Sequence, residues 1–475
     1  MSSATLLHGG TVVSMAPGRP RSERADILVE NGRITAMGPN LSDASTGDAQ
    51  RVDVSHQLLL PGFVDTHRHS WQTGIRGVAA DWSLLEYVRN IRMGYARAYR
   101  PEDVYASVLV GLLEAVDSGI TSMCDFCHII NSPAHADAAL DAFAASGIRG
   151  LLSYGFYDVP LAQPAFKSHG ERIADVERFA RKFGQRGRGP MGLGVALTET
   201  LLVTPEQVRA EIAAARALGL RITAHMGTLS TPDAIARLDC AGLLGPDILH
   251  VHCNFSSDDE LKRVRDSGGA VAVTPETELQ MGMGFPVTGR LLRLGLRPTL
   301  GIDIVSDYSG DMFMQMRMAL QTERALRNEP TLRERKMPPT VSPTVLDALH
   351  FATVDGANAL GLGCEVGCLA PGMAADIVSL RTDGLHYMPP AEPVASIVLQ
   401  ARPSDVAHVL VAGKFLKRDG ALVGWDLAQL RRQITDSNTY LLDAVAHQSE
   451  VATATTSAYS NAISSIVDEK KSSPA

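Results

Sequence analysis

The feature that most constrains the fold is a regular alternation of short apolar segments with helical ones, beginning at Pro61. Counting from Val64, strand-length segments recur before a helix or a long loop, at residues 64–69, 120–125, 148–154, 191–197, 221–225, 247–252, 270–274 and 298–303. Together they span about 300 residues, within the usual length of a (β/α)8 barrel. We therefore expect an α/β chain folded as a (β/α)8 TIM barrel. A doubly wound open sheet is the alternative.

Both ends of the chain have the pattern of short β-strands instead. Residues 6–13 and 26–38 read as strands, the second as a hairpin closed by Asn31-Gly32, a strong two-residue turn signal. Near the other end, strands are predicted at residues 376–380, 395–399 and 408–415. We expect residues 1–60 and 365–425 to form a small composite β-sandwich beside a metal-binding barrel of residues 61–364. Residues 426–475 are expected to form a helix and then a mobile tail, because the Ala/Ser/Thr-rich end has little to bury.

The first barrel strand carries two histidines one residue apart, His67 and His69. Side chains alternate faces along a strand, so both imidazoles point the same way. Neutral imidazole is a favoured ligand of zinc and neighbouring transition metals. The pair therefore makes half of a metal site, although a lone His-x-His is more often an ordinary surface feature.

The remaining ligands are found at the ends of later strands. In a (β/α)8 barrel, the carboxyl ends of the strands build the active site. Those ends hold His225 on the fifth strand, His252 on the sixth and Asp303 on the eighth. We expect three histidines and Asp303 to bind one divalent ion, with His252 left beside it as a proton carrier.

At this point the chain resembles the amidohydrolase superfamily over roughly residues 5–430. Within it, the chain is similar to the branch of mononuclear deaminases and chlorohydrolases, which includes cytosine, guanine and methylthioadenosine deaminases and triazine hydrolases. The resemblance rests on the first-strand motif of residues 61–69, on Gln72, Arg76-Gly77 and Asp81 after it, on His252-Cys253 with residues 257–260, and on residues 300–303 and 367–378.

The resemblance implies that His67, His69, His225 and Asp303 bind the metal and that His252 holds the hydrolytic water. Related binuclear enzymes carry a bridging carboxylated lysine on the fourth strand, and residues 191–200 contain no lysine, which favours a single ion. Zinc is the first expectation, with iron or manganese as alternatives, because three imidazoles and a carboxylate suit all of them. A divalent ion lowers the pKa of bound water from about 15.7 to about 7. The resulting hydroxide attacks an electron-poor ring carbon, while Asp303 moves the proton to the leaving group.

The substrate shell departs from the family pattern. Most members place a glutamate three residues after the fifth-strand histidine, where this chain has Thr228. The usual Pro-x-Ser-Asn after the seventh strand is replaced by Pro275-Glu276-Thr277-Glu278. A hydroxyl cannot serve as an acid at neutral pH, so another group must substitute or the reaction must not need one. The predicted substrate-binding residues are Gln72, Trp82, His128, Glu199, Glu276 and Glu278, the last three being the candidate acids; a solvated loop is an equal alternative for Glu276 and Glu278.

Composition limits the partners. The chain has 475 residues, a net charge of −8 and no long basic run, which argues against nucleic acid and an anionic membrane surface as partners. No apolar stretch approaches the roughly 20 residues needed to span a bilayer. The absence of a charged leader and the six cysteines favour a reducing cytoplasm. We expect a small-molecule substrate, and the resemblance leaves a homo-oligomer open.

These observations predict a metal-dependent hydrolase of non-peptide carbon–nitrogen bonds that deaminates an amino-substituted nitrogen heterocycle or a cyclic amidine. The alternative keeps the fold and the metal but uses them for amide hydrolysis, dehalogenation or closure of an amidine or imidazoline ring. A third interpretation is a binding protein that has lost its chemistry, which the intact set of histidines and Asp303 argues against.

Overall fold

The structure is a computed structural model. It describes residues 4–41, 49–159, 161–186, 189–200, 202–228, 233–389 and 392–447. The tail expected to be mobile, from residue 448 on, lies outside these residues.

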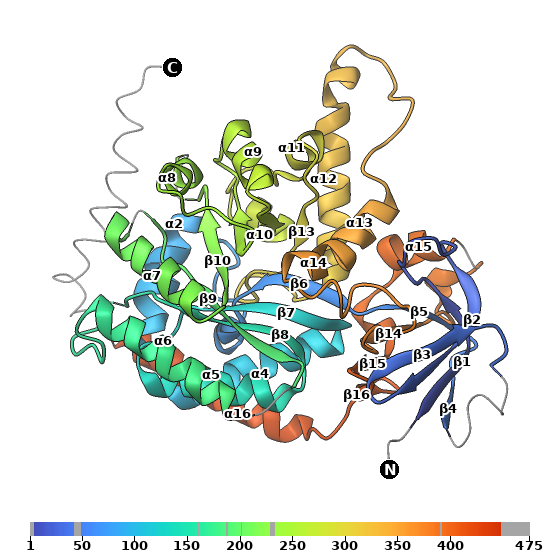
Figure 1. Cartoon of the computed structure of the whole chain (residues 1–475), viewed down its shortest axis with the longest axis horizontal. Helices are drawn as coiled ribbons and strands as arrows, with labels where there is room; N and C mark the ends of the chain where they lie inside the picture. Colours follow the sequence, from blue (N-terminus) through green and yellow to red (C-terminus); the bar gives the residue numbers. More distant parts are fainter. Residues whose placement is uncertain are drawn as a thin grey trace.

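Within the described chain, the barrel sheet has eight parallel strands in sequence order, which confirms the predicted α/β class (Figure 1). The strands are β6 (Phe63–Arg68), β7 (Ile120–Cys127), β8 (Arg149–Gly155), β9 (Met191–Ala196), β10 (Arg221–Met226), β11 (Ile248–His252), β12 (Ala270–Val273) and β13 (Thr299–Leu300). A parallel bridge between Arg68 and Asp303 joins the last strand region to the first. Each of the eight strands corresponds to a predicted segment.

Several of the helices that follow the strands begin at a side-chain cap, among them α6, α7, α9, α12 and α13. Before α7, for example, the Thr204 hydroxyl accepts a hydrogen bond from the backbone N–H of Gln207, and Pro205 occupies the first turn. The longer helices are α4 (Pro101–Asp117), α5 (Pro133–Ser146), α6 (His169–Gly184), α7 (Pro205–Ala217), α8 (Ala234–Cys240), α9 (Asp258–Asp266), α12 (Met312–Arg333) and α13 (Val345–Phe351). The shorter ones include α2 (Leu84–Tyr87), η2 (Val88–Tyr95), α10 (Pro275–Gln280), α11 (Thr288–Arg293) and α14 (Val354–Ala359).

The two ends of the chain meet in a second sheet beside the barrel, drawn in blue and orange in Figure 1. In the described residues it has nine strands, which are β1 (Thr5–Val12), β2 (Glu23–Glu30), β3 (Arg33–Gly38), β4 (Gln50–Asp53), β5 (Gln57–Pro61), β14 (Ile377–Arg381), β15 (Val406–Val411), β16 (Lys414–Arg418) and β17 (Ala421–Leu422). Asn31 and Gly32 have φ values of 53° and 79°, as a type I′ hairpin turn requires. Leu7, Ile27 and Leu410 belong to its own small core.

Two strand predictions in this region were wrong. Residues 395–399 form helix, as α15 (Pro393–Ala395) and η4 (Ser396–Gln400). The Glu392 carboxylate caps Ala395 at 2.7 Å, and fully buried Val394, Ile397 and Val398 lie at helical spacing, so packing overrides their β propensity. Residues 408–415 are not one strand, because Ala412 and Gly413 turn with φ of 46° and 73° between β15 and β16.

The barrel and the second sheet are joined by a buried ion pair. The Arg149 guanidinium on β8 binds the Asp376 carboxylate through two hydrogen bonds of 2.7 and 3.0 Å. The predicted terminal helix is confirmed as α16 (Leu427–Ala446), where Asn438 donates to the carbonyl of Gly74 at 2.8 Å. Among the helices described, none is long and apolar enough to cross a membrane.

Candidate metal centre

His67 lies at the carboxyl end of β6 and His69 directly follows that strand, while Asp303 lies in the segment after β13. The buried Asp65 carboxylate fixes the two segments by accepting from the backbone N–H groups of His67 at 3.2 Å and Ile302 at 3.0 Å. Gly301 is required here, because a Cβ atom at that position would lie 2.8 Å from the Cβ of His67. The sequence Leu300-Gly301-Ile302-Asp303 therefore brings a carboxylate directly beside the two histidines.

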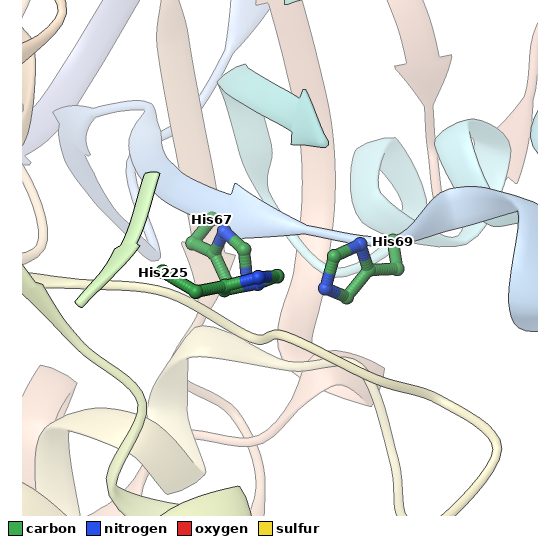
Figure 2. A group of neighbouring side chains, drawn as sticks. All are labelled: His67, His69 and His225. Carbon is green, nitrogen blue, oxygen red and sulfur yellow. The ribbon is translucent and has the colours of Figure 1, made fainter. Parts of the chain in front are cut away.

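Four of the predicted ligands converge. The Nε2 atoms of His67 and His69 lie 3.2 and 3.3 Å from Asp303 Oδ1. The Nε2 atom of His225, on β10, lies 3.3 Å from that of His67. Figure 2 shows the rings of His67 and His225 turned toward each other with His69 beside them. One ligand atom from each of His67, His69 and His225 lies within 4.8 Å of the others.

The outer nitrogens of two of these rings are held by the protein. His69 donates its Nδ1–H to the carbonyl of Phe126 at 2.8 Å, and His225 Nδ1 lies 2.9 Å from Glu199 Oε1. A neutral imidazole that donates from Nδ1 keeps its lone pair on Nε2, which is the atom facing the centre. The surroundings therefore select the tautomer that can bind a metal.

The residues fit a divalent cation. Burial lowers the pKa of His67 and His225, so both rings are neutral and can donate a lone pair to a metal ion. Burial alone would raise the pKa of Asp303, but its contacts with His67 and His69 outweigh this and hold the pKa well below its usual range. Lone pairs of neutral imidazoles and a carboxylate, packed this closely away from water, repel one another unless a cation lies between them.

His252 stands at the same centre with a different neighbourhood. Its Nε2 lies 3.8 Å from Asp303 Oδ2, and its Nδ1 lies 3.0 Å from Thr274 Oγ1 and 3.3 Å from Glu278 Oε1. Burial would lower the pKa of His252, but Glu278 and Asp303 outweigh this and raise it. His252 and Asp303 have positive φ values of 71° and 70°, a strained conformation typical of functional positions.

The three candidate acids lie in different places. Glu199 contacts His225, and the fully buried Glu278 contacts His252. Glu276 is half-buried, and its carboxylate accepts from the Gln315 amide at 3.0 Å. Burial and the nearby Asp311 and Asp307 raise the pKa of Glu276 to about 8. Thr228, where the family glutamate would stand, is buried.

The other predicted substrate residues differ in how they are used. The buried amide of Gln72 is occupied at both ends, donating to Tyr87 Oη at 2.6 Å and accepting from Ser306 Oγ at 2.7 Å. Trp82 is half-buried at the start of the segment before α2. The ring of His128 stacks on that of His69, with centroids 4.1 Å apart.

Sequence reasoning missed several contacts of the centre. The Tyr157 hydroxyl lies 3.2 Å from His225 Nδ1, and the ring of Phe126 stacks on that of His225 at 4.3 Å. The Trp71 indole N–H donates to His128 Nδ1 at 2.9 Å. Phe126 is the residue before the last one of β7, and Tyr157 lies two residues after β8, so their position near strand ends was the available signal.

The chain is similar to known proteins in sequence and in fold. Residues 58–416 match the model of the Amidohydrolase family. The chain is 29% identical over 449 residues to 5-methylthioadenosine/S-adenosylhomocysteine deaminase 1 of Syntrophus aciditrophicus (strain SB), covering 90% of this chain and 96% of that protein. It is 28% identical over 429 residues to 5'-deoxyadenosine deaminase of Methanosarcina mazei, covering 87% and 93%. A zinc-bound adenosine deaminase structure from Xanthomonas campestris has the same fold, with a TM-score of 0.83, 23% identity and coverage of 93% and 99%.

Proposed function

This chain belongs to the amidohydrolase family, and from that premise we propose that it deaminates the adenine ring of a 5′-modified adenine nucleoside. It is a metal-dependent hydrolase of carbon–nitrogen bonds, as the sequence predicted. Two observations together support this substrate. The side chains of His67, His69, His225 and Asp303 converge at the end of the barrel. The chain also aligns over most of its length with proteins named as deaminases of such nucleosides.

His67, His69, His225 and Asp303 would hold the ion, and zinc is the metal in the Xanthomonas structure. A bound divalent ion supplies Lewis acidity, which makes water a nucleophile at neutral pH. In the overall reaction a water oxygen bonds to the amino-bearing ring carbon, the carbon–nitrogen bond breaks and ammonia leaves.

The chain's own residues move the protons. Asp303 Oδ2 faces His252, so it can take the proton of the attacking water and return it to the departing amine. His252 can donate from Nε2 to the oxygen that gains charge, because its Nδ1 is held by Thr274 and Glu278. Glu199 and Tyr157 keep His225 oriented.

Glu276 is our candidate for the acid that replaces the family glutamate. With a pKa of about 8 its carboxyl group carries a proton at neutral pH and could deliver it to a ring nitrogen. Glu199 and Glu278 are less suited, because each already accepts a hydrogen bond from a histidine of the centre.

Thr228 in place of the glutamate supports a second candidate, ring closure of an amidine with loss of water, since that reaction need not protonate a ring nitrogen in the same way. One experiment separates the two. Zinc-loaded protein is incubated with 5′-methylthioadenosine, S-adenosylhomocysteine, 5′-deoxyadenosine and β-amino amides, and ammonia and products are measured. Ammonia release that is absent in Asp303→Asn supports deamination, whereas a product formed only by loss of water supports ring closure.

A further inference from the structure

His128 is held by one contact that fixes the position of its ring proton. The Trp71 indole N–H donates to His128 Nδ1 at 2.9 Å. Both side chains are buried, Trp71 fully and His128 with 2% exposed. The Arg92 guanidinium donates to the His128 carbonyl at 2.8 Å and lies over the Trp71 ring, 5.9 Å from its centroid. The imidazole therefore has one fixed place and one fixed rotation.

The tautomer follows from the donor's identity. An indole nitrogen is only a donor, so His128 Nδ1 must be an acceptor and cannot carry a proton. The ring is consequently neutral with its proton on Nε2. In a cationic ring, Nδ1 would also carry a hydrogen, and this N–H group would face the indole N–H of Trp71.

This arrangement also excludes His128 from the metal. Its ring stacks on His69 with centroids 4.1 Å apart and planes 18° apart, and lies 6.2 Å from the ring of His225. Its Nδ1 lone pair is occupied and its Nε2 bears hydrogen, so no lone pair is free for an ion. What remains at the edge of the centre is one N–H group, for which the described residues supply no hydrogen-bond acceptor. His128 Nε2 is not one of the fully enclosed, unpartnered polar atoms of the described chain, so water or a bound ligand can reach this N–H group.

We propose that His128 Nε2–H is a specificity-determining donor that binds an acceptor atom of the substrate, and that Trp71 is the positioning residue that keeps the proton on Nε2. The inference rests on the proposed deamination at the neighbouring metal centre and names the substrate class further. The substrate must have a ring nitrogen or an oxygen acceptor beside the reacting amine. A substrate with a C–H group at that position cannot accept the hydrogen bond from His128 and is a poor substrate.

The tautomer is tested on the zinc-loaded full chain by nitrogen-15 NMR of labelled histidine, with His128→Gln to assign the signal. We expect a neutral His128 protonated on Nε2. Trp71→Phe, which keeps an aromatic ring but removes the N–H, should give a mixture of tautomers. Tyr99→Phe is the matched control, since it removes the 2.8 Å bond to the Trp71 carbonyl and leaves the indole N–H in place. A wild-type ring protonated on Nδ1 would overturn the proposal.

Recognition is tested with 5′-methylthioadenosine and its 3-deaza and 7-deaza analogues. We expect His128→Leu to lower kcat/KM for the parent nucleoside by roughly tenfold or more. For the analogue that lacks the acceptor nitrogen, we expect wild type and His128→Leu to have the same low kcat/KM. Equal kcat/KM for wild type and His128→Leu on every substrate would overturn the role in binding. A failure of the proposed function can be told apart from a failure of this inference. If no adenine nucleoside is turned over, the proposed function is contradicted, and the NMR spectrum still shows whether His128 is protonated on Nε2.

Discussion

Asp303 and His67 are joined twice. The backbone N–H of Asp303 donates to the His67 carbonyl at 2.8 Å, and the Asp303 carboxylate lies 3.2 Å from His67 Nε2. The first contact closes the barrel between its last and first strands, and the second builds the candidate metal centre. Closure of the barrel and assembly of the centre are therefore one structural event, which ties stability to metal affinity.

Gly301→Ala should damage both properties together. The new methyl group would lie 2.8 Å from the Cβ and 2.9 Å from the carbonyl oxygen of His67, so β6 must shift. Overpacking of this kind typically costs about 1–3 kcal/mol. Urea unfolding and zinc titration should show a lower free energy of unfolding and weaker binding. Gly38→Ala, which meets nothing within 4 Å, is the control, and equal behaviour of the two variants would contradict the coupling.

Glu199→Gln should weaken metal binding. Glu199 accepts from His225 Nδ1 at 2.9 Å, and an amide lacks the charge that makes this ring a strong donor to the ion. Loss of such an outer partner typically costs about 10–100-fold in metal affinity. Competition with a chelator measures it, with exposed Glu177→Gln as the control. Unchanged affinity would remove Glu199 from the centre.

The candidate acids are separated by single Gln substitutions of Glu199, Glu276 and Glu278. Burial and the nearby Asp311 and Asp307 raise the pKa of Glu276 to about 8, so its carboxyl group holds a proton below that pH and loses it above. We expect kcat of the wild type to fall above about pH 8 and Glu276→Gln to lower kcat by roughly 100-fold. Full turnover by all three variants would show that the reaction needs no substitute acid.

Glu211 should make stability depend on pH. Its fully buried carboxyl group accepts from the backbone N–H and hydroxyl of Thr198, and burial raises its pKa to about 8 against 4.5 for the free side chain. The folded state then holds a proton that the unfolded state releases, so the free energy of unfolding falls as pH rises from about 4.5 toward 8. Glu211→Gln cannot titrate and should show a smaller fall in urea unfolding between pH 5 and 8. A fall as steep as the wild type's would contradict the assigned pKa.

The sequence was most informative at positions where the metal site or the backbone conformation allows few residue types. His67 and His69 at a strand end, and Asp303 two residues after Gly301, were readable because strand periodicity and barrel topology determine where they meet. The hairpin at Asn31-Gly32 was readable for the same reason, since few residues accept two positive φ angles.

Contacts decided by packing were not readable. Residues 395–399 are rich in β-branched side chains and still form helix, because their apolar face is buried. Gln72 stays a predicted substrate-binding residue, and only the folded chain shows that its amide contacts Tyr87 and Ser306. The pairing of Trp71 with His128 joins residues 57 positions apart, and only the folded chain shows it.

The most direct test of the account is turnover of 5′-methylthioadenosine by the zinc-loaded protein in water enriched in oxygen-18, followed by mass spectrometry. We predict ammonia and a product that carries one oxygen-18 in place of the ring amino group, with Asp303→Asn inactive. Zinc-loaded protein that releases no ammonia from any adenine nucleoside, or a product that carries no oxygen from water, would contradict it.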